Sequence, residues 1–64
     1  MRRRIIVNFT HDPTEAFEGI LWGYRGRWLT LKDATALKAG PVSPKLPGEI
    51  LIHRSQIAFL QVLP

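Results

Sequence analysis

Apolar residues recur at every second position through most of this sequence, and this period decides which secondary structure the chain can form. Near the start, Ile5, Val7 and Phe9 are each separated by one residue. Many of the apolar residues are β-branched or aromatic, which favours a pleated strand over a helix. No segment shows the 3.6-residue apolar period of a helix of ordinary length. The sequence therefore predicts an all-β protein.

Turn-forming residues divide the chain into five extended runs. These runs are residues 4–9, 17–24, 27–37, 50–52 and 57–63. Asp12 and Pro13 favour a turn after the first run. Residues 38–48 contain three prolines and two glycines, which predicts a long loop because proline supplies no N–H to a sheet. We find no repeat and no second unit, so residues 1–64 are expected to form one domain.

A two-residue turn at residues 25–26 is expected to set the register of the central hairpin, because its glycine accepts the positive φ of a tight turn. This register places Trp22 opposite Leu29 on the core face, and Trp28 over the bare backbone of Gly23 on the other face. Two glycines four residues apart in the second run permit the sharp bending that a small closed barrel needs.

The chain is short, with 64 residues, and it has no cysteine. A chain of this size buries only about 60% of the surface that its unfolded form exposes, so its core is marginal without a disulfide, a metal or a partner. With two histidines and no cysteine, neither a metal site nor a cofactor is indicated. No cysteine nucleophile, phosphate-binding glycine loop or carboxylate cluster suggests an enzyme. We expect self-association or docking on a larger assembly.

The charge balance suits a polyanionic partner. Nine Lys and Arg against five Asp and Glu give a formal net charge of +4, although excess charge also serves solubility. No apolar run approaches the roughly 18 residues of a membrane span. The apolar stretch after the N-terminal arginines is too short for a secretory signal. We expect a cytoplasmic protein without membrane contact, or a component of the virion if the gene is viral.

Two segments resemble the motifs of the Sm/Lsm/Hfq family of small barrels. Residues 17–34 read FEGILWGYRGRWLTLKDA, and residues 48–62 read GEILIHRSQIAFLQV, in which Ile52 and Ile57 frame a short corner. The resemblance implies a five-stranded, strongly bent antiparallel small barrel of the Src-homology type. The family's N-terminal helix is missing, since only residues 1–3 precede the first expected strand.

The resemblance also implies a ring of six or seven identical subunits, in which the fourth strand of one subunit pairs with the fifth strand of its neighbour. An apolar edge strand without proline, such as residues 50–53, is open to pairing of this kind. The residues expected at this interface are Ile50, Leu51, Ile52, Ile57 and Phe59.

Family members commonly bind single-stranded RNA, with bases stacked on planar side chains and basic residues on phosphates. The family's RNA-contacting segment corresponds here to residues 24–28, and its Arg-Gly pair corresponds to residues 53–54. None of the family's residues is retained there, so the contacts are assigned by residue type. The expected contacts are Tyr24, Arg25, Arg27, Trp28, His53 and Arg54, with Arg2, Arg3 and Arg4 as a phosphate-binding arm.

Each of these sets also has a purely structural interpretation. The arginine arm is then a solvated terminus, and the stems of the hairpin arginines cover aromatic rings. His53 then bonds a backbone carbonyl, and Arg54 pairs with Glu49 or Asp33 of a neighbour. The first expectation is a homo-oligomeric binder of single-stranded RNA or another polyanion. The alternatives are a connector, plug or decoration of a phage particle or other assembly, and a small-ligand sponge with pockets between subunits.

Overall fold

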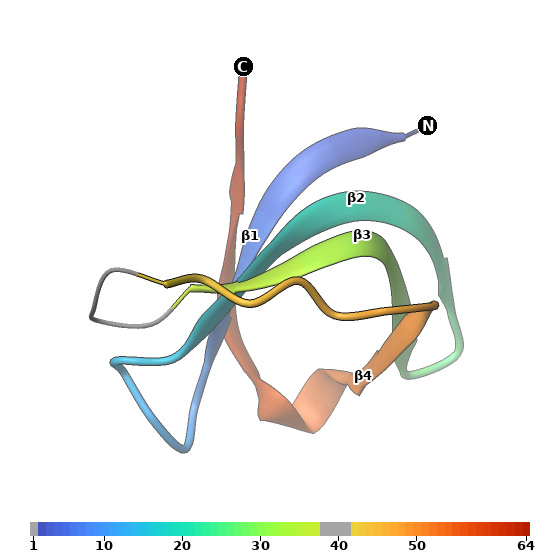
Figure 1. Cartoon of the computed structure of the whole chain (residues 1–64). Coiled ribbons are helices and arrows are strands. Elements are labelled where there is room, and N and C mark those ends of the chain that lie inside the picture. Colours follow the sequence, from blue (N-terminus) through green and yellow to red (C-terminus); the bar gives the residue numbers. More distant parts are fainter. Residues whose placement is uncertain (1, 38–41) are drawn as a thin grey trace.

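Five antiparallel strands form one strongly bent sheet (Figure 1). The computed structural model describes residues 2–37 and 42–64. The strands are β1 (Arg3–Phe9), β2 (Ala16–Arg25), β3 (Trp28–Leu37), β4 (Ile50–His53) and β5 (Ile57–Val62), with a 3₁₀ turn, η1 (Arg54–Gln56), between the last two. Their order across the sheet is β4-β3-β2-β1-β5, so β4 and β5 are the outer strands. The predicted all-β class with five antiparallel strands is confirmed.

No helix in the described residues has the length and the apolar character that crossing a membrane requires. Part of the predicted long loop, residues 38–41, lies outside the described residues. Its second half runs beside β3, because the Leu46 N–H donates to the Ala34 carbonyl at 2.8 Å and the Ala36 N–H donates to the Pro44 carbonyl at 2.9 Å.

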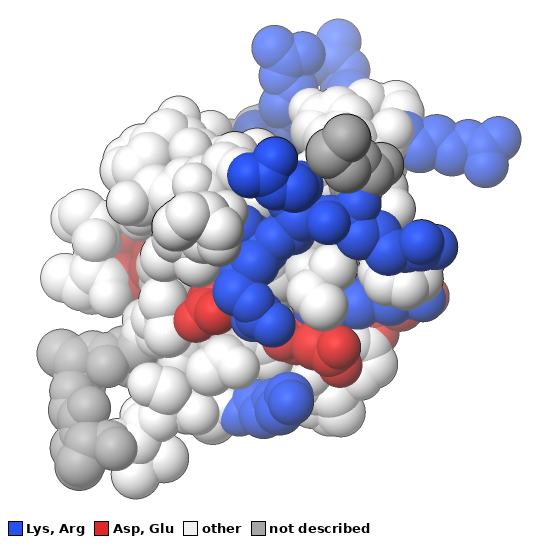
Figure 2. Space-filling model, turned by 90° about the horizontal axis from the view of Figure 1, so that it is seen from above, with Lys and Arg blue, Asp and Glu red and all other residues white. Residues whose placement is uncertain are grey.

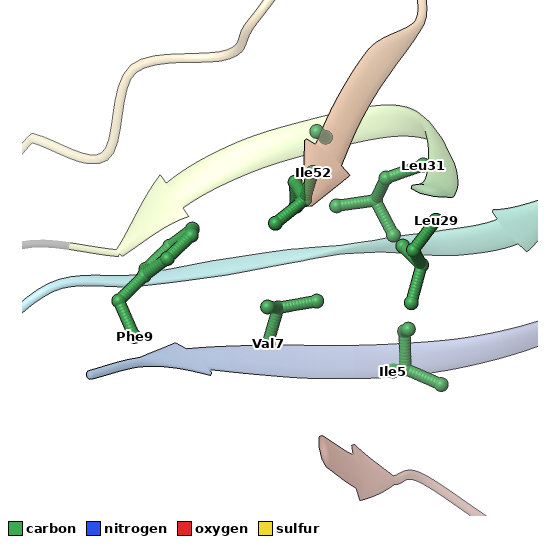
Figure 3. Close-up of a cluster of buried hydrophobic side chains, with 7 residues drawn as sticks. Ile5, Val7, Phe9, Leu29, Leu31 and Ile52 are labelled. Carbon is green, nitrogen blue, oxygen red and sulfur yellow. The ribbon is translucent and has the colours of Figure 1, made fainter. Parts of the chain in front are cut away.

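The core lies on the concave face of the sheet (Figure 3). Ile5, Val7 and Phe9 of β1 are buried there, as the alternation predicts. Leu29 and Leu31 of β3 belong to the same cluster, and each is fully buried. Burying an aliphatic side chain of this size contributes about 1.5–3 kcal/mol, so these few residues supply most of the apolar stabilisation of a small fold.

The central hairpin turns one residue later than predicted. Its two turn residues are Gly26 and Arg27, and Arg25 pairs with Trp28. Gly26 has a φ of 62°, and a tight hairpin turn of type II′ takes glycine at this first position. The predicted register is therefore wrong, because the glycine had been placed at the second position of the turn.

The corrected register changes the surroundings of both tryptophans. Tyr24, rather than Trp22, lies opposite Leu29, and Gly23 lies opposite Thr30 rather than Trp28. The pairing shifts between Leu21 and Gly23, so that Trp22 is an extra residue in β2 and its side chain is 40% exposed. Trp22 is therefore a surface residue and not a core residue.

A second irregularity in the pairing of β2 with β3 lies at Gly19. Glu18 pairs with Thr35 and Ile20 pairs with Lys32, so Gly19 faces two residues of β3 instead of one. One of these is Asp33, which has a positive φ of 51°. A β-bulge of this kind bends its strand and increases its twist. The extra residue belongs to β3, so this bulge bends β3, whereas the prediction placed a sharp bend at the glycines of the second strand.

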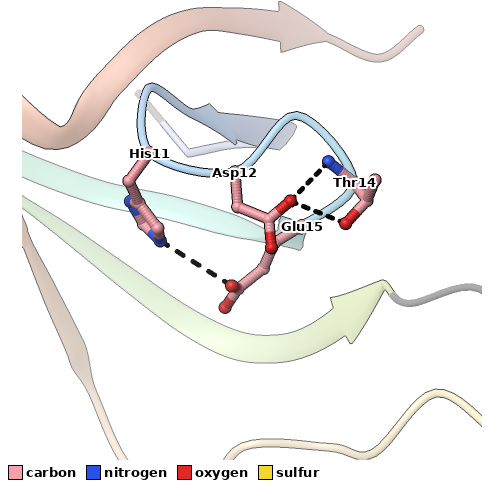
Figure 4. Close-up of polar contacts among 4 residues, drawn as sticks. All are labelled: His11, Asp12, Thr14 and Glu15. Atoms are coloured by element: carbon pink, nitrogen blue, oxygen red, sulfur yellow. Dashed lines mark hydrogen bonds and ion pairs between the residues drawn. The ribbon is translucent and has the colours of Figure 1, made fainter.

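The connection between β1 and β2 is a turn closed by an aspartate side chain (Figure 4). Asp12 Oδ1 accepts hydrogen bonds from the Thr14 hydroxyl at 2.7 Å and from the Thr14 backbone N–H at 2.9 Å. These bonds hold the pKa of Asp12 below its ordinary value, the hydroxyl contributing most. Beside this turn, His11 Nε2 lies 3.7 Å from Glu15 Oε2.

The close packing at Gly19 predicts a large cost for Gly19→Ala. A Cβ atom there would lie 2.8 Å from Leu31 Cγ and 2.9 Å from the Lys32 carbonyl oxygen. Overpacking of this kind costs about 1–3 kcal/mol, which we expect as a lower midpoint of urea unfolding. The matched control is Gly23→Ala, since a Cβ at Gly23 meets nothing within 4 Å. Equal midpoints for the two variants would contradict the packing at Gly19.

The turn predicts how Asp12 titrates. A carboxyl whose pKa is lowered by folding stabilises the protein above its unfolded pKa, and the contribution is lost as the pH falls below about 4. In an NMR titration of the side-chain carboxyls we expect Thr14→Ala to raise the pKa of Asp12 toward its ordinary value. Thr10→Ala should leave that pKa unchanged. An Asp12 pKa that does not respond to the Thr14 substitution would contradict the bonded turn.

Candidate functional site

The tip of the β2–β3 hairpin and the turn η1 lie together at one end of the sheet. The Arg54 backbone N–H donates to the Arg27 carbonyl at 2.7 Å, and Trp28 pairs with His53 across β3 and β4. Arg25 is the cross-strand partner of Trp28. Five of the predicted contact residues are therefore neighbours, and we call Arg25, Arg27, Trp28, His53 and Arg54 the cationic tip.

Trp28 and His53 form the aromatic part of the cationic tip. Their ring centroids lie 4.9 Å apart in an edge-to-face arrangement, and Trp28 is 49% exposed. The Ser55 backbone N–H donates to His53 Nδ1 at 3.2 Å, so the neutral imidazole carries its proton on Nε2, where it remains a donor. An exposed indole beside a fixed donor is suited to stacking a planar ligand.

The three arginines of the cationic tip have no carboxylate partner among the described residues. Each of the three glutamates in the sequence forms an ion pair with a residue outside the cationic tip. The pairs are Arg4–Glu18 at 3.0 Å, Lys32–Glu49 at 3.5 Å and His11–Glu15 at 3.7 Å. Arg25, Arg27 and Arg54 are all exposed. Their positive charge is therefore left uncompensated at one end of the sheet, where it attracts anions.

Tyr24 does not share the face that carries Trp28. It pairs with Leu29, whose side chain is in the core, whereas Trp28 pairs with Arg25 on the opposite face of the hairpin. Tyr24 is half exposed because it lies near the end of β2. The structure therefore separates one predicted stacking residue from the other.

The three N-terminal arginines are held against the sheet. Arg3 and Arg4 are the first residues of β1. Arg4 pairs with Glu18, and Arg3 Nη2 donates to the Leu63 carbonyl at 3.5 Å. Figure 2, seen from the side on which both chain ends lie in Figure 1, shows Lys and Arg side chains spread widely over this face. A phosphate-binding role for these arginines stays a prediction.

Trp22 is a surface feature that sequence reasoning missed. The Arg2 guanidinium carbon lies 3.8 Å from its ring centroid, and Lys32 Nζ lies 3.9 Å from it. Such cation–π contacts hold both charges on the indole. The alternation of apolar residues assigns Trp22 to the core, and only the bulge beside it brings it to the surface. The neighbouring Gly23 is the only sign of that bulge in the sequence, because glycine inside a strand often marks one.

A groove of about 420 Å³ opens beside the cationic tip, and Trp28 and His53 belong to both. Its other walls include β4 and two phenylalanines, Phe9 at the end of β1 and Phe17 near the start of β2, whose ring centroids lie 4.8 Å apart in an edge-to-face arrangement. The β1–β2 connection adds the polar residues His11 and Glu15. Aromatic walls with a few polar groups are typical of sites for small planar groups. Nothing in the pattern of residues indicates that the β1–β2 connection lines this groove.

The residues expected at a subunit interface have unequal exposure. Ile52 is buried in the core of its own chain, and Ile50 and Ile57 are partly buried against that core. Leu51 of β4 and Phe59 of β5 are exposed. Both strands have one edge without a partner strand in a single copy. The interface itself stays a prediction.

No family model, no curated protein and no solved structure matches this chain.

Proposed function

We propose that this protein is a non-enzymatic binder of single-stranded RNA or a similar polyanion, and that it binds through the cationic tip. The observation that carries the proposal is that the backbone pairing brings three exposed arginines, which have no carboxylate partner among the described residues, next to the exposed residue Trp28. In this arrangement Arg25, Arg27 and Arg54 contact phosphates, and Trp28 stacks on a base.

Phosphate contact and base stacking contribute in different ways. Each arginine that neutralises a phosphate releases counterions, so its contribution falls with salt concentration. Stacking of a base on an aromatic side chain contributes about 1–3 kcal/mol and depends little on salt or on base identity. The groove beside Trp28, whose lining includes none of the three arginines, gives a stacked base room. The resemblance of residues 17–34 and 48–62 to the Sm/Lsm/Hfq motifs supports the same proposal.

A structural role in a larger assembly is the second candidate function. It is favoured by the exposed apolar residues of the outer strands, such as Leu51 and Phe59, since contiguous exposed apolar surface marks contact sites. A protein with only this role has no affinity of its own for nucleic acid, so the binding experiment below separates the two candidates.

The proposed site predicts different effects for charge and for stacking. With a fluorescein-labelled single-stranded oligoribonucleotide, we expect Arg54→Ala to weaken binding several-fold and to reduce the slope of log K against log salt by about 0.7. We expect Trp28→Ala to weaken binding at least fivefold while leaving that slope unchanged. Fluorescence anisotropy across a salt series measures both quantities.

The matched control for charge is Lys45→Ala. Lys45 is also an exposed cation, but it lies beside Thr35, near the other end of β3 from the cationic tip. We expect its removal to change the affinity far less than the removal of Arg54. Equal losses for Lys45→Ala and Arg54→Ala would show non-specific attraction by net charge. Undetectable binding by the unaltered protein would overturn the proposal and leave the structural role.

A further inference from the structure

The outer edge of β5 is apolar and uncharged. Leu60 is 39% exposed, and Phe59 and Val62 are each 58% exposed. No charged residue occurs in residues 57–63, in a chain whose net charge is +4. Outer strands of stable monomers usually carry lysine, proline or another feature that prevents pairing. Near the start of β5 the register with β1 shifts, which leaves Ala58 as an extra residue. Between this bulge and Pro64 the strand lacks such a feature.

The main-chain groups of β5 show which residues face outward. The Leu63 N–H donates to the Arg4 carbonyl at 2.9 Å, and the same register continues with Val62 opposite Ile5. Hydrogen-bonded pairs alternate along an antiparallel ladder. Gln61 therefore bonds toward β1, whereas Leu60 and Val62 direct their N–H and C=O groups away from it. These groups form the open edge of the sheet in a single copy.

The side chains of the outward residues lie on the core face. Leu60 pairs with Val7 and Val62 pairs with Ile5, and both β1 partners are fully buried. Gln61 lies on the opposite face, where its side chain accepts a hydrogen bond from Asn8 at 3.0 Å. The residues that offer free main-chain groups are thus the ones whose side chains extend the core.

We propose that two copies of this chain associate by pairing β5 with β5 in an antiparallel arrangement around a two-fold axis at Gln61. In this register Leu60 forms a hydrogen-bonded pair with the partner's Val62, and Val62 forms one with the partner's Leu60. Each pair exchanges two main-chain bonds. The product is one sheet of ten strands, five from each copy.

This pairing covers the exposed part of each core with the core face of the other copy. Leu60 and Val62 are both aliphatic and both lie on that face, so each covers its counterpart across the new ladder. Because an isologous interface presents the same uncharged strand twice, no charged residue of β5 meets a like charge across it. Phe59 lies on the other face, where the partner's Leu63 is its opposite residue.

The outer strand β4 is less suited to receive β5. The bond from the Arg54 N–H to the Arg27 carbonyl sets the ladder of β3 and β4, so Leu51 and His53 are its outward residues. Their side chains share the outer face with Thr30 and Trp28. Pairing β4 with β5 would therefore join the outer face of one copy to the core face of the next. The two-fold pairing joins core face to core face, and it is favoured over the ring that the family resemblance implies.

A single cysteine tests the register. Gln61→Cys places one thiol at the two-fold axis in a chain without any other cysteine. Residues directly opposite in a pair without hydrogen bonds have Cα atoms about 4.5 Å apart, which lies within the range of a disulfide. Under mild oxidation we expect most of the protein to run as a covalent dimer on a non-reducing gel. Ser43→Cys, whose cysteine lies in an exposed loop segment, should run as a monomer on the same gel. Equal cross-linking of the two variants would overturn the proposed register.

Two proline variants test the edge itself by light scattering. The unaltered protein should have twice its 7.3 kDa mass. Val62→Pro removes an N–H that β1 does not use, so the fold should persist by circular dichroism while the dimer becomes a monomer. Leu51→Pro removes an outward N–H of β4 in the same way and should leave the dimer intact.

Three outcomes would overturn the proposal: a monomeric unaltered protein, a ring of six or seven copies, or dissociation by Leu51→Pro. None of them depends on the RNA measurements, because the dimer does not rest on the proposed function. The Gln61→Cys result also remains decisive if Val62→Pro fails to fold. If Arg54→Ala weakens RNA binding but Gln61→Cys does not cross-link, the RNA site is supported and the dimer is not.

Discussion

The close approach of β2 to β3 at Gly19 is the contact on which the remaining structure depends. With no side chain at this position, Leu31 and the Lys32 carbonyl come within a distance that a Cβ would prevent. The bulge at Asp33 then bends β3. The bend turns one face of a small sheet inward, so that Leu29 and Leu31 are fully buried without a second sheet or an α-helix to cover them. A chain of this size depends on that bend for its core.

The two-residue apolar period and the turn-forming residues predict the strands of this fold. They do not predict which residues of β2 and β3 lie opposite each other. The alternation of Ile5, Val7 and Phe9 identifies a core-facing strand because burial on one face imposes a period of two. The position of Gly26 within a two-residue turn is ambiguous in sequence, since glycine suits both places. Moving the turn by one residue changes the expected partner of Trp22 from Leu29 to Leu31, and both leucines are in the core, so this ambiguity does not by itself expose Trp22. The incorrect burial of Trp22 follows from the bulge beside it, for which the neighbouring Gly23 is the only sign in the sequence.

The cationic tip was largely predictable because its members lie next to turns, where residues are exposed and adjacent for local reasons. Arg25, Arg27 and Trp28 surround one turn, and His53 begins another. Their meeting depends on the pairing of β3 with β4, which was not among the expectations from the sequence. The groove beside them was not predictable, since it needs the β1–β2 connection to approach β4 across the concave face. Contacts of that kind depend on curvature rather than on local pattern.

The proposed binding site and the proposed dimer contact use different residues. The cationic tip ends at Arg54, in the turn η1 that joins β4 to β5, whereas the two-fold axis lies at Gln61, near the far end of β5. A dimer formed through β5 therefore leaves both tips exposed, each at a distance from the two-fold axis. If both proposals hold, a strand of nucleic acid that reaches both tips of one dimer would meet the second tip at a higher effective concentration than on a separate chain. Pairing of β5 with β5 would thus stabilise a marginal core. It would also strengthen the binding of nucleic acid, although the β5 edge does not itself contact the nucleic acid.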